Sequence, residues 1–190
     1  MRTLALLPAF FGIPSFATLI NTQFPHLLIP LVSTSPDTAF GTQKDATVSY
    51  SSSTGAQQWT AISFDVPNNA ATICRLNFKV NTDPSMGAPF ELNGTAPFAI
   101  NISRIKPTLN AQTTTWNNRP ATIDYYDTYT ISQDKQVTEI NSKWFDCPKG
   151  MVAQFIIHPA SQRDLDLYWF ELAYGADEGG PHGVVLEMHA

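Results

Sequence analysis

Residues 73–80 read Ile-Cys-Arg-Leu-Asn-Phe-Lys-Val, and this stretch shows the period of the fold most plainly. Apolar residues alternate with polar ones, so that one strand face holds Cys74, Leu76, Phe78 and Val80. A strand with one apolar face buries that face against a second layer. The stretch therefore predicts a half-buried strand in which Cys74 points into the core.

Similar runs recur along the chain and are separated by turn residues such as Pro67-Asn68-Asn69. With residues 73–80 they make about nine expected strands. The others are residues 26–32, 46–51, 59–66, 96–105, 137–140, 151–158, 165–172 and 183–189. No long stretch has a 3.6-residue apolar repeat and no βαβ spacing occurs. The sequence thus predicts an all-β, antiparallel β-sandwich, jelly-roll-like or immunoglobulin-like, with the strand order left open.

The N-terminus has the features of a secretory signal peptide. Arg2 precedes an apolar run over residues 4–11, and Ser15 and Ala17 are small residues at the spacing of a cleavage site. Pro8, Gly12 and Pro14 interrupt the run, which is short for a membrane span. We expect a signal peptide over residues 1–17, one domain over residues 18–190 and an extracellular or cell-wall location.

Cys74 and Cys147 are the two cysteines of the chain. In an oxidising compartment two cysteines most simply form one disulfide. Closing the loop between residues 74 and 147 restricts the unfolded chain. In the chain-entropy model this restriction raises the free energy of unfolding by roughly 4 kcal/mol. Two glycosylation sequons, at Asn93 and Asn101, fit the same compartment. Asn101 alternates with Ile100 and Ile102, so we expect its side chain to face solvent.

Charge excludes two classes of partner. Charged residues make up 14% of the chain, its net charge is −5, and lysine and arginine form no cluster. Nucleic acid and anionic membrane surfaces are therefore not expected partners.

Catalytic motifs are absent from the sequence, and we expect no enzyme, cofactor or metal site. The four histidines have no motif spacing with a serine or aspartate, and no Gly-x-Ser-x-Gly elbow occurs. Asp164 and Asp166 would share a strand face and could act on a polysaccharide if they faced each other across a groove. A solvated strand face is the simpler interpretation. The acidic loop with Asp177, Glu178 and His182 is likewise a cation-site candidate or a plain surface loop.

Aromatic residues in turn-rich sequence are the better candidates for a ligand site. Trp116, Tyr125 and Tyr126 fall outside the clear strand periodicity, and sugar rings stack on such side chains when they are exposed. Trp59 and Trp169 lie within expected strands and are expected to be buried.

Several segments together resemble a fungal family, the ubiquitin-3-binding-protein C-terminal domain. The matching stretches are residues 24–30, 35–41, 64–67, 74–78, 147–150 and 168–186. The resemblance covers nearly all of residues 18–190 and implies a secreted β-sandwich rather than an active site. The acidic, glycine-rich stretch at residues 176–180 departs from the family pattern.

A second, local resemblance covers residues 113–121, Thr-Thr-Thr-Trp-Asn-Asn-Arg-Pro-Ala. It is similar to the Thr-Trp-Asn-Asn-x-Pro signature of extracellular β-sandwich modules and implies a fold more than a ligand. We expect a secreted, non-catalytic binding module for glycan or cell-wall polysaccharide. The alternatives are a polysaccharide-acting enzyme that uses Asp164 and Asp166, and a protein-interaction domain linked to a ubiquitin-like pathway.

Overall fold

The structure is a computed structural model and describes residues 17–141 and 143–190. Of the expected signal peptide over residues 1–17, residues 1–16 lie outside the described residues. These ranges contain thirteen strands and one 3-10 turn. The strands are β1 (Leu19–Gln23), β2 (Leu27–Val32), β3 (Asp45–Tyr50), β4 (Gln57–Asp65), β5 (Ile73–Lys79), β6 (Phe90–Gly94), β7 (Phe98–Ile105), β8 (Thr122–Ile131), β9 (Val137–Glu139), β10 (Phe145–Asp146), β11 (Val152–Pro159), β12 (Leu165–Phe170) and β13 (Gly183–His189); η1 (Ala176–Glu178) is the 3-10 turn.

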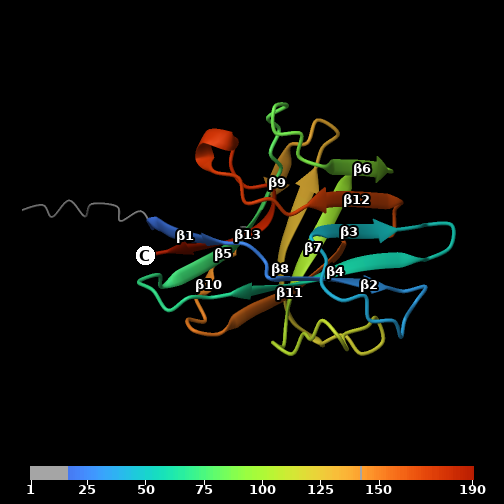
Figure 1. Cartoon of the computed structure of the whole chain (residues 1–190). Coiled ribbons are helices and arrows are strands. Elements are labelled where there is room, and N and C mark those ends of the chain that lie inside the picture. The colour runs from blue at the N-terminus through green and yellow to red at the C-terminus, as the bar shows by residue number, and fades with distance from the viewer. Residues whose placement is uncertain (1–16, 142) are drawn as a thin grey trace, which may run out of the picture.

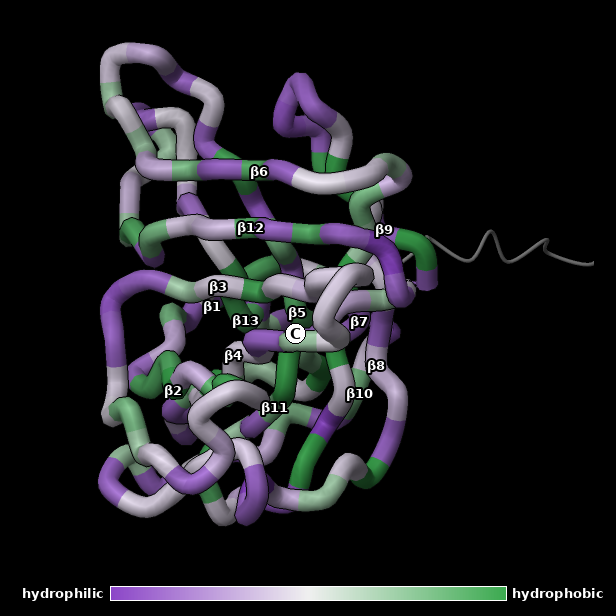
Figure 2. The backbone as a smooth tube through the Cα atoms, turned by 90° about the vertical axis from the view of Figure 1, so that its right-hand side faces the viewer, coloured by the Kyte–Doolittle hydropathy of each residue, from purple (hydrophilic) through white to green (hydrophobic). Residues whose placement is uncertain are grey.

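Two antiparallel sheets form the molecule (Figure 1). The small sheet has the order β1-β13-β5-β10. The large sheet has the order β6-β12-β3-β4-β11-β7-β8-β9, and β2 also pairs with β4. Figure 2 shows hydrophobic stretches in the strands at the middle of the molecule and hydrophilic ones in the outer loops. The predicted all-β sandwich is confirmed.

The main core lies between the sheets. From the small sheet, Leu76, Phe78 and Leu186 meet Phe64 and Phe155 of the large one, and all five side chains are buried. Burying a side chain of this size contributes about 1.5–3 kcal/mol. The alternation of residues 73–80 therefore marks the face on which the sandwich closes.

A second, smaller apolar cluster lies on the outer face of the large sheet. Ile29, Ala61 and Ile156 are fully buried there, and Leu109 and Trp116 of the segment after β7 pack on them. Because a segment covers this part of the outer face, β2 and β4 are apolar on both sides. This explains the nearly continuous apolar run at residues 27–32.

All nine expected strands are present, and four further strands were not expected. These are β1, β6, β8 and β10. β1 lies before the first expected strand, and it pairs with the C-terminal strand β13. β10 has only two residues, and β8 has no simple alternation. Short or irregular edge strands lack the period-two signal, because their side chains do not divide into one buried and one exposed face.

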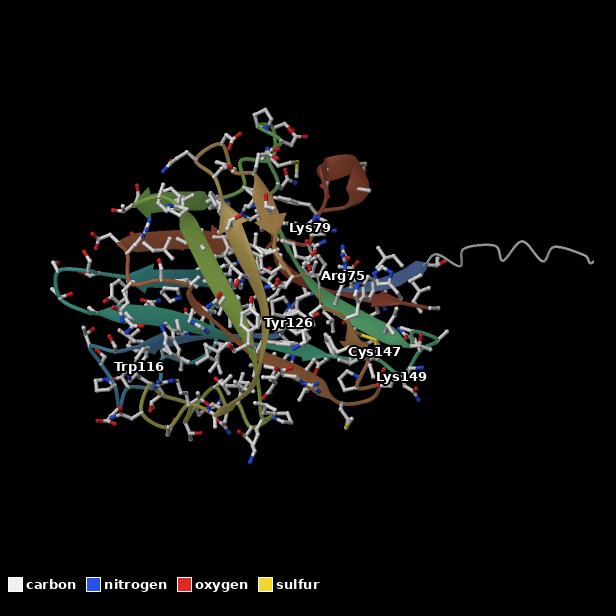
Figure 3. All side chains as sticks on the ribbon, turned by 180° about the vertical axis from the view of Figure 1, so that it is seen from behind. Arg75, Lys79, Trp116, Tyr126, Cys147 and Lys149 are labelled. Carbon is white, nitrogen blue, oxygen red and sulfur yellow. A yellow bond between two sulfur atoms is a disulfide. The ribbon has the colours of Figure 1, made fainter. Side chains whose placement is uncertain are left out.

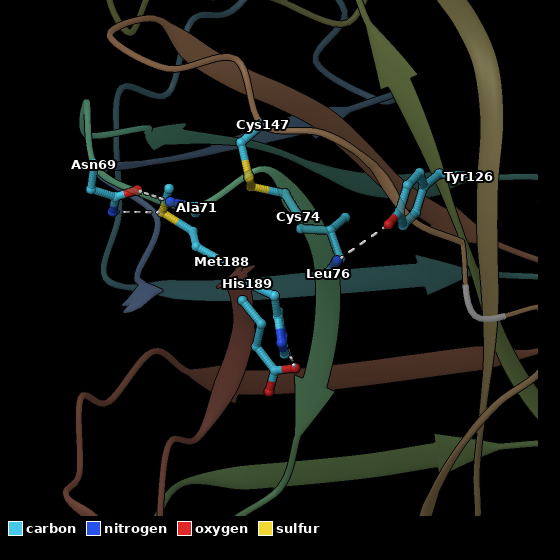
Figure 4. Close-up of a disulfide and its surroundings, with 9 residues drawn as sticks. Asn69, Ala71, Cys74, Leu76, Tyr126, Cys147, Met188 and His189 are labelled. Atoms are coloured by element: carbon cyan, nitrogen blue, oxygen red, sulfur yellow. Dashed lines mark hydrogen bonds and ion pairs between the residues drawn. A yellow bond between two sulfur atoms is a disulfide. The ribbon is translucent and has the colours of Figure 1, made fainter. Parts of the chain in front are cut away.

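The predicted disulfide between Cys74 and Cys147 is confirmed (Figure 4). Cys74 is fully buried in β5, and Cys147 directly follows β10. The Cys147 N–H donates to the carbonyl of Thr72. The bond therefore fixes β10 and the loop that follows it against β5 of the small sheet.

Ion pairs and hydrogen bonds link β5 and β13 on the outer face of the small sheet. The Glu187 carboxylate of β13 accepts hydrogen bonds from Lys79 Nζ (2.6 Å), Arg75 Nε (2.9 Å) and Asn77 Nδ2 (3.1 Å), all from β5. Burial by itself would raise the pKa of Glu187, but these donors outweigh it and lower the pKa to about 2. Figure 3 shows Arg75 and Lys79 along this strand.

Candidate functional site

The three aromatic candidates do not come together. Trp116 lies in the turn-rich segment after β7, and Figure 3 shows it well apart from Tyr126. Tyr126 is 3% exposed and packs between Phe145 and Phe155 in the main core. Tyr125 is 43% exposed. The expectation that Tyr126 is an exposed candidate is therefore wrong.

A β-bulge explains the burial of Tyr126. In the β7–β8 pairing Ser103 lies opposite Tyr125 and Ile102 lies opposite Asp127, so that Tyr126 has no opposite residue. A bulge changes the direction in which the side chain of the extra residue points, and it interrupts the alternation of side chains between the two faces of the strand. Tyr126 and Asp127 are consequently both buried although they are neighbours in the chain.

Trp116 is half-buried and its ring is occupied by other side chains. The ring centroids of Trp116 and Trp59 lie 4.8 Å apart, and the Arg119 guanidinium lies 4.3 Å from the Trp116 centroid. Arg119 also lies 4.8 Å from the centroid of Trp59 and donates to the Trp116 carbonyl. Because cation–π contacts already cover these rings, Trp116 serves mainly to cover the second apolar cluster.

Exposed apolar side chains of the large sheet lie at the N-terminal half of β8. β7 pairs with β8 over its whole length, whereas β9 pairs only with Tyr129–Ile131. Within the described ranges, residues 122–126 therefore have no strand on their second side. Ile123 is 58% exposed, and Ile140, which follows β9, is 54% exposed. We call Ile123, Asp124, Tyr125, Ile140 and Lys143 the β8 edge surface.

Polar groups of the β8 edge surface are held in a defined arrangement. Lys143 Nζ donates to the Tyr125 carbonyl (2.8 Å) and to Asp124 Oδ2 (2.7 Å). The Tyr125 hydroxyl lies 2.6 Å from Thr128 Oγ1 and accepts from Asn141 Nδ2 at 2.6 Å. An exposed aromatic ring, an exposed isoleucine and a fixed cation thus lie at the open edge of β8. Ile140 lies where this open edge ends, since its N–H donates to the Thr128 carbonyl at 2.9 Å.

The acidic pair predicted from the sequence lies elsewhere. Asp164, Asp166 and Gln57 line a groove of about 440 Å³ beside the β3–β4 hairpin. Both oxygens of Asp164 accept hydrogen bonds from Ser52, from the backbone N–H at 2.7 Å and from the hydroxyl at 2.8 Å. These donors lower the pKa of Asp164, which keeps it ionised and unsuited to donate a proton.

The acidic loop candidate is also divided. Asp177 and Glu178 are exposed, whereas His182 is fully buried. His182 Nδ1 accepts from the Asn81 N–H at 3.0 Å, and its Nε2 donates to the Pro89 carbonyl at 3.0 Å, so the ring is neutral. Burial lowers the pKa of His182. In the part of the chain that the structure describes, no three His, Cys, Asp or Glu side chains are placed to hold a metal.

The two sequons differ in their surroundings. Asn93 is exposed on the edge strand β6. Asn101 is half-buried in β7, and its Oδ1 accepts a hydrogen bond from Thr128 Oγ1 at 2.5 Å. Asn101 lies on the outer face, as its alternation predicted, but neighbouring strands partly cover it.

Sequence reasoning missed Ile123, Ile140 and Lys143, because exposure at a strand end leaves no periodic signal.

It also missed Glu171, whose carboxyl is buried. Glu171 Oε1 accepts from Trp169 Nε1 (2.8 Å) and the Val184 N–H (2.9 Å), while Oε2 has no hydrogen-bond partner among the described residues. Burial raises the pKa of Glu171 to about 8. Gly183 makes room for it, since a Cβ at this position would lie 2.1 Å from Oε2.

Comparison with known proteins supplies the family. No curated protein matches the chain. In residues 17–141 and 143–190 no helix is long and apolar enough to cross a membrane. The family model described as the ubiquitin 3 binding protein But2 C-terminal domain matches residues 23–174, which span β2 to β12 and include both cysteines. The chain therefore belongs to the But2 C-terminal domain family.

Proposed function

We propose that this protein is a secreted, non-catalytic binding module that recognises a partner protein through the β8 edge surface. The observation that carries the proposal is the exposure of Ile123 and Tyr125 on a strand edge that no strand of the described ranges covers, next to the exposed Ile140. Exposed apolar side chains framed by polar ones are typical of protein-interaction sites. The family name, which describes a protein that binds ubiquitin 3, supports a protein ligand.

A non-catalytic role is consistent with the titratable groups. Asp164 is held ionised by Ser52, and Glu171, whose pKa is raised, keeps both carboxyl oxygens inside the fold. A general acid must reach its substrate with a proton to donate, and neither residue combines these properties. The groove beside the β3–β4 hairpin is thus a poor fit for a paired-carboxylate hydrolase.

Glycan is the second candidate ligand, favoured by one observation. The exposed Tyr125 ring adjoins a row of amide and hydroxyl groups, formed by Asn141, Thr128 and Asn101, that are linked by hydrogen bonds. Sugar sites combine an aromatic face with such polar groups. Of the three aromatic residues predicted from the sequence, Tyr125 is the one with the exposure that this role needs.

Photo-cross-linking distinguishes the two ligand classes. We expect the protein with p-benzoylphenylalanine in place of Tyr125 to form adducts when it is incubated with purified ubiquitin, with fungal secreted proteins or with cell-wall polysaccharide. Protease-sensitive adducts support a protein ligand, and glycosidase-sensitive adducts support glycan. The ubiquitin incubation tests the ligand in the family name directly.

The matched control carries the same photoreactive residue in place of Met151. Met151 is 64% exposed and lies directly before β11, which β7 separates from β8 in the large sheet. Equal labelling at positions 125 and 151 would show that the contact is non-specific. Absence of any adduct at position 125 with all three preparations would refute the proposed function.

Secretion is the proposed route to the extracellular space, with cleavage after Ala17. The two termini support this site, because the Thr18 N–H donates to the Ala190 carbonyl and the Ala190 N–H donates to the Thr18 carbonyl, each at 3.0 Å. A chain that starts at Thr18 would keep β1 and all its pairing with β13. N-terminal sequencing of the secreted protein tests the site.

A further inference from the structure

We infer that the ligand of the β8 edge surface is a short extended segment of the partner protein, which adds as a strand beside β8 and carries alternating apolar side chains and at least one carboxylate. The inference rests on the proposed function and specifies its mode of binding. It follows from the backbone at the edge, the side chains beside it and the local charge.

The backbone at this edge can accept a strand. β8 is ten residues long, and its N-terminal half pairs with β7 alone in the described ranges. The Tyr125 carbonyl accepts a hydrogen bond from Lys143 Nζ at 2.8 Å. In an added strand, a backbone N–H of the partner would donate to this carbonyl instead. Lysine on an edge strand commonly prevents indiscriminate strand pairing. The side chains of Lys143 and Asp124 are 42% and 55% exposed, and an ion pair so exposed contributes at most about 1 kcal/mol. A peptide N–H can therefore displace the ammonium at little cost.

The exposed side chains select apolar residues in the added strand. Ile123 and Tyr125 are two positions apart in β8, and Ile140 follows the short β9. Alternate side chains of an added strand lie above the same face as its neighbours' side chains. Apolar residues at every second position of the partner segment would cover these residues, and backbone hydrogen bonds would provide the remaining affinity.

Positive charge beside the N-terminal half of β8 favours a carboxylate in the partner segment. Arg104 lies directly opposite Asp124 in the β7–β8 pairing, and Lys106 follows β7 immediately. With Lys143, which forms an ion pair with Asp124, three cations thus lie in the segments that flank the N-terminal half of β8, although the whole chain has a net charge of −5. Arg104 and Lys106 are exposed and form no ion pair within 4 Å among the described residues, and the Arg104 guanidinium lies over the Phe145 ring, 5.6 Å from its centroid. An acidic residue in the partner segment would compensate this local positive charge.

Two irregularities limit the segment to a few residues. The β7–β8 register shifts at Tyr126 and again at Ile123, and β9 covers the edge from Tyr129 onward. A bulge increases the local twist and interrupts a regular ladder. The open edge therefore suits one short peptide better than a long sheet built from copies of this chain.

A designed peptide tests the inference. The probe is a short synthetic peptide in which valine alternates with glutamate, and binding is followed through the backbone amide NMR signals of the full-length protein. We expect the largest shifts at residues 122–126. Two peptides of the same sequence, one N-methylated at its glutamates and one at its valines, test the backbone hydrogen bonds. Successive N–H groups of a strand point to opposite edges, so one of the two peptides lacks the donors that face β8 and should bind at least about tenfold more weakly.

Protein variants locate the contact. Ile123→Lys should weaken binding of the valine–glutamate peptide about tenfold, because it places a charge where an apolar contact is expected. Met151→Lys alters an equally exposed apolar residue elsewhere and should leave binding unchanged. Lys143→Ala should reduce the preference for the glutamate peptide over its glutamine counterpart, which we expect to be about fivefold in the wild type. Thermal unfolding of each variant verifies that it is folded.

The results separate this inference from the proposed function. Failure of the valine–glutamate peptide to bind, undiminished binding of both N-methylated peptides, or shifts confined to another surface would each overturn strand addition. If protein adducts still form at position 125, the binding function would stand with a different mode. If no adducts form there, the function itself would fail.

Discussion

Glu171 shows how much a single buried carboxyl can affect stability. Its Oε1 accepts two hydrogen bonds and its Oε2 lies against Gly183, whose φ of +118° is one that side-chain-bearing residues rarely adopt. Burial favours the neutral acid and raises the pKa of Glu171 from an ordinary value of 4.5 to about 8. The native protein thus retains a proton here that the unfolded chain releases.

We predict that Glu171→Gln reduces the pH dependence of stability. Because the folded pKa is raised, the stabilising effect of protonation is fully present below pH 4.5 and is lost as the pH rises through 8. Over this interval Glu171 lowers the unfolding free energy by up to about 1.4 kcal/mol per pH unit. Glutamine keeps the acceptor for Trp169 and Val184 and does not titrate. Urea unfolding of both proteins at pH 5 and pH 8.5 measures the difference, and parallel pH profiles would contradict the prediction.

At the scale of the elements, β10 depends on the disulfide. This two-residue strand pairs with β5 through Phe145 opposite Cys74 and Asp146 opposite Ile73, a ladder too short to be stable alone. The covalent bond follows it directly at Cys147. It therefore also positions the neighbouring segment that contains Lys143, a member of the β8 edge surface.

Replacing both cysteines by alanine is expected to lower the unfolding free energy by roughly 4 kcal/mol, because a bridge across a sequence separation of 73 residues restricts the unfolded chain. Hydrogen exchange should accelerate most over residues 143–150, while the β4–β11 ladder stays protected. Chemical denaturation and exchange of the double variant measure both effects. Uniform acceleration over the whole molecule would show that the bridge supports the entire sandwich rather than this loop.

At the scale of the whole molecule, the proposed secretion predicts a defined product. We expect protein from a fungal host to begin at Thr18 and to carry sugar at Asn93, at Asn101 or at both, as the motifs at these positions require. Mass spectrometry before and after glycosidase treatment reads both properties. Asn93→Gln and Asn101→Gln identify the modified site. An intact Met1 without a mass shift would instead favour an intracellular protein.

Alternating side chains determined much of this protein from the sequence alone. They predicted nine of the thirteen strands, the burial of Cys74 and a two-sheet sandwich, and the presence of only two cysteines predicted their bond. These features are local or follow from simple counting. Burial of one strand face imposes a period of two wherever a regular strand lies on the core.

Only the tertiary structure decided the candidate site. The bulge that turns Tyr126 inward depends on its pairing with β7, and the open edge of β8 depends on where β9 ends. Trp116 is covered because Trp59 of β4 meets it across the fold, beside Arg119 of its own segment. Each of these outcomes is set by contacts between segments distant in the sequence, and no local pattern of residues encodes which edge remains uncovered.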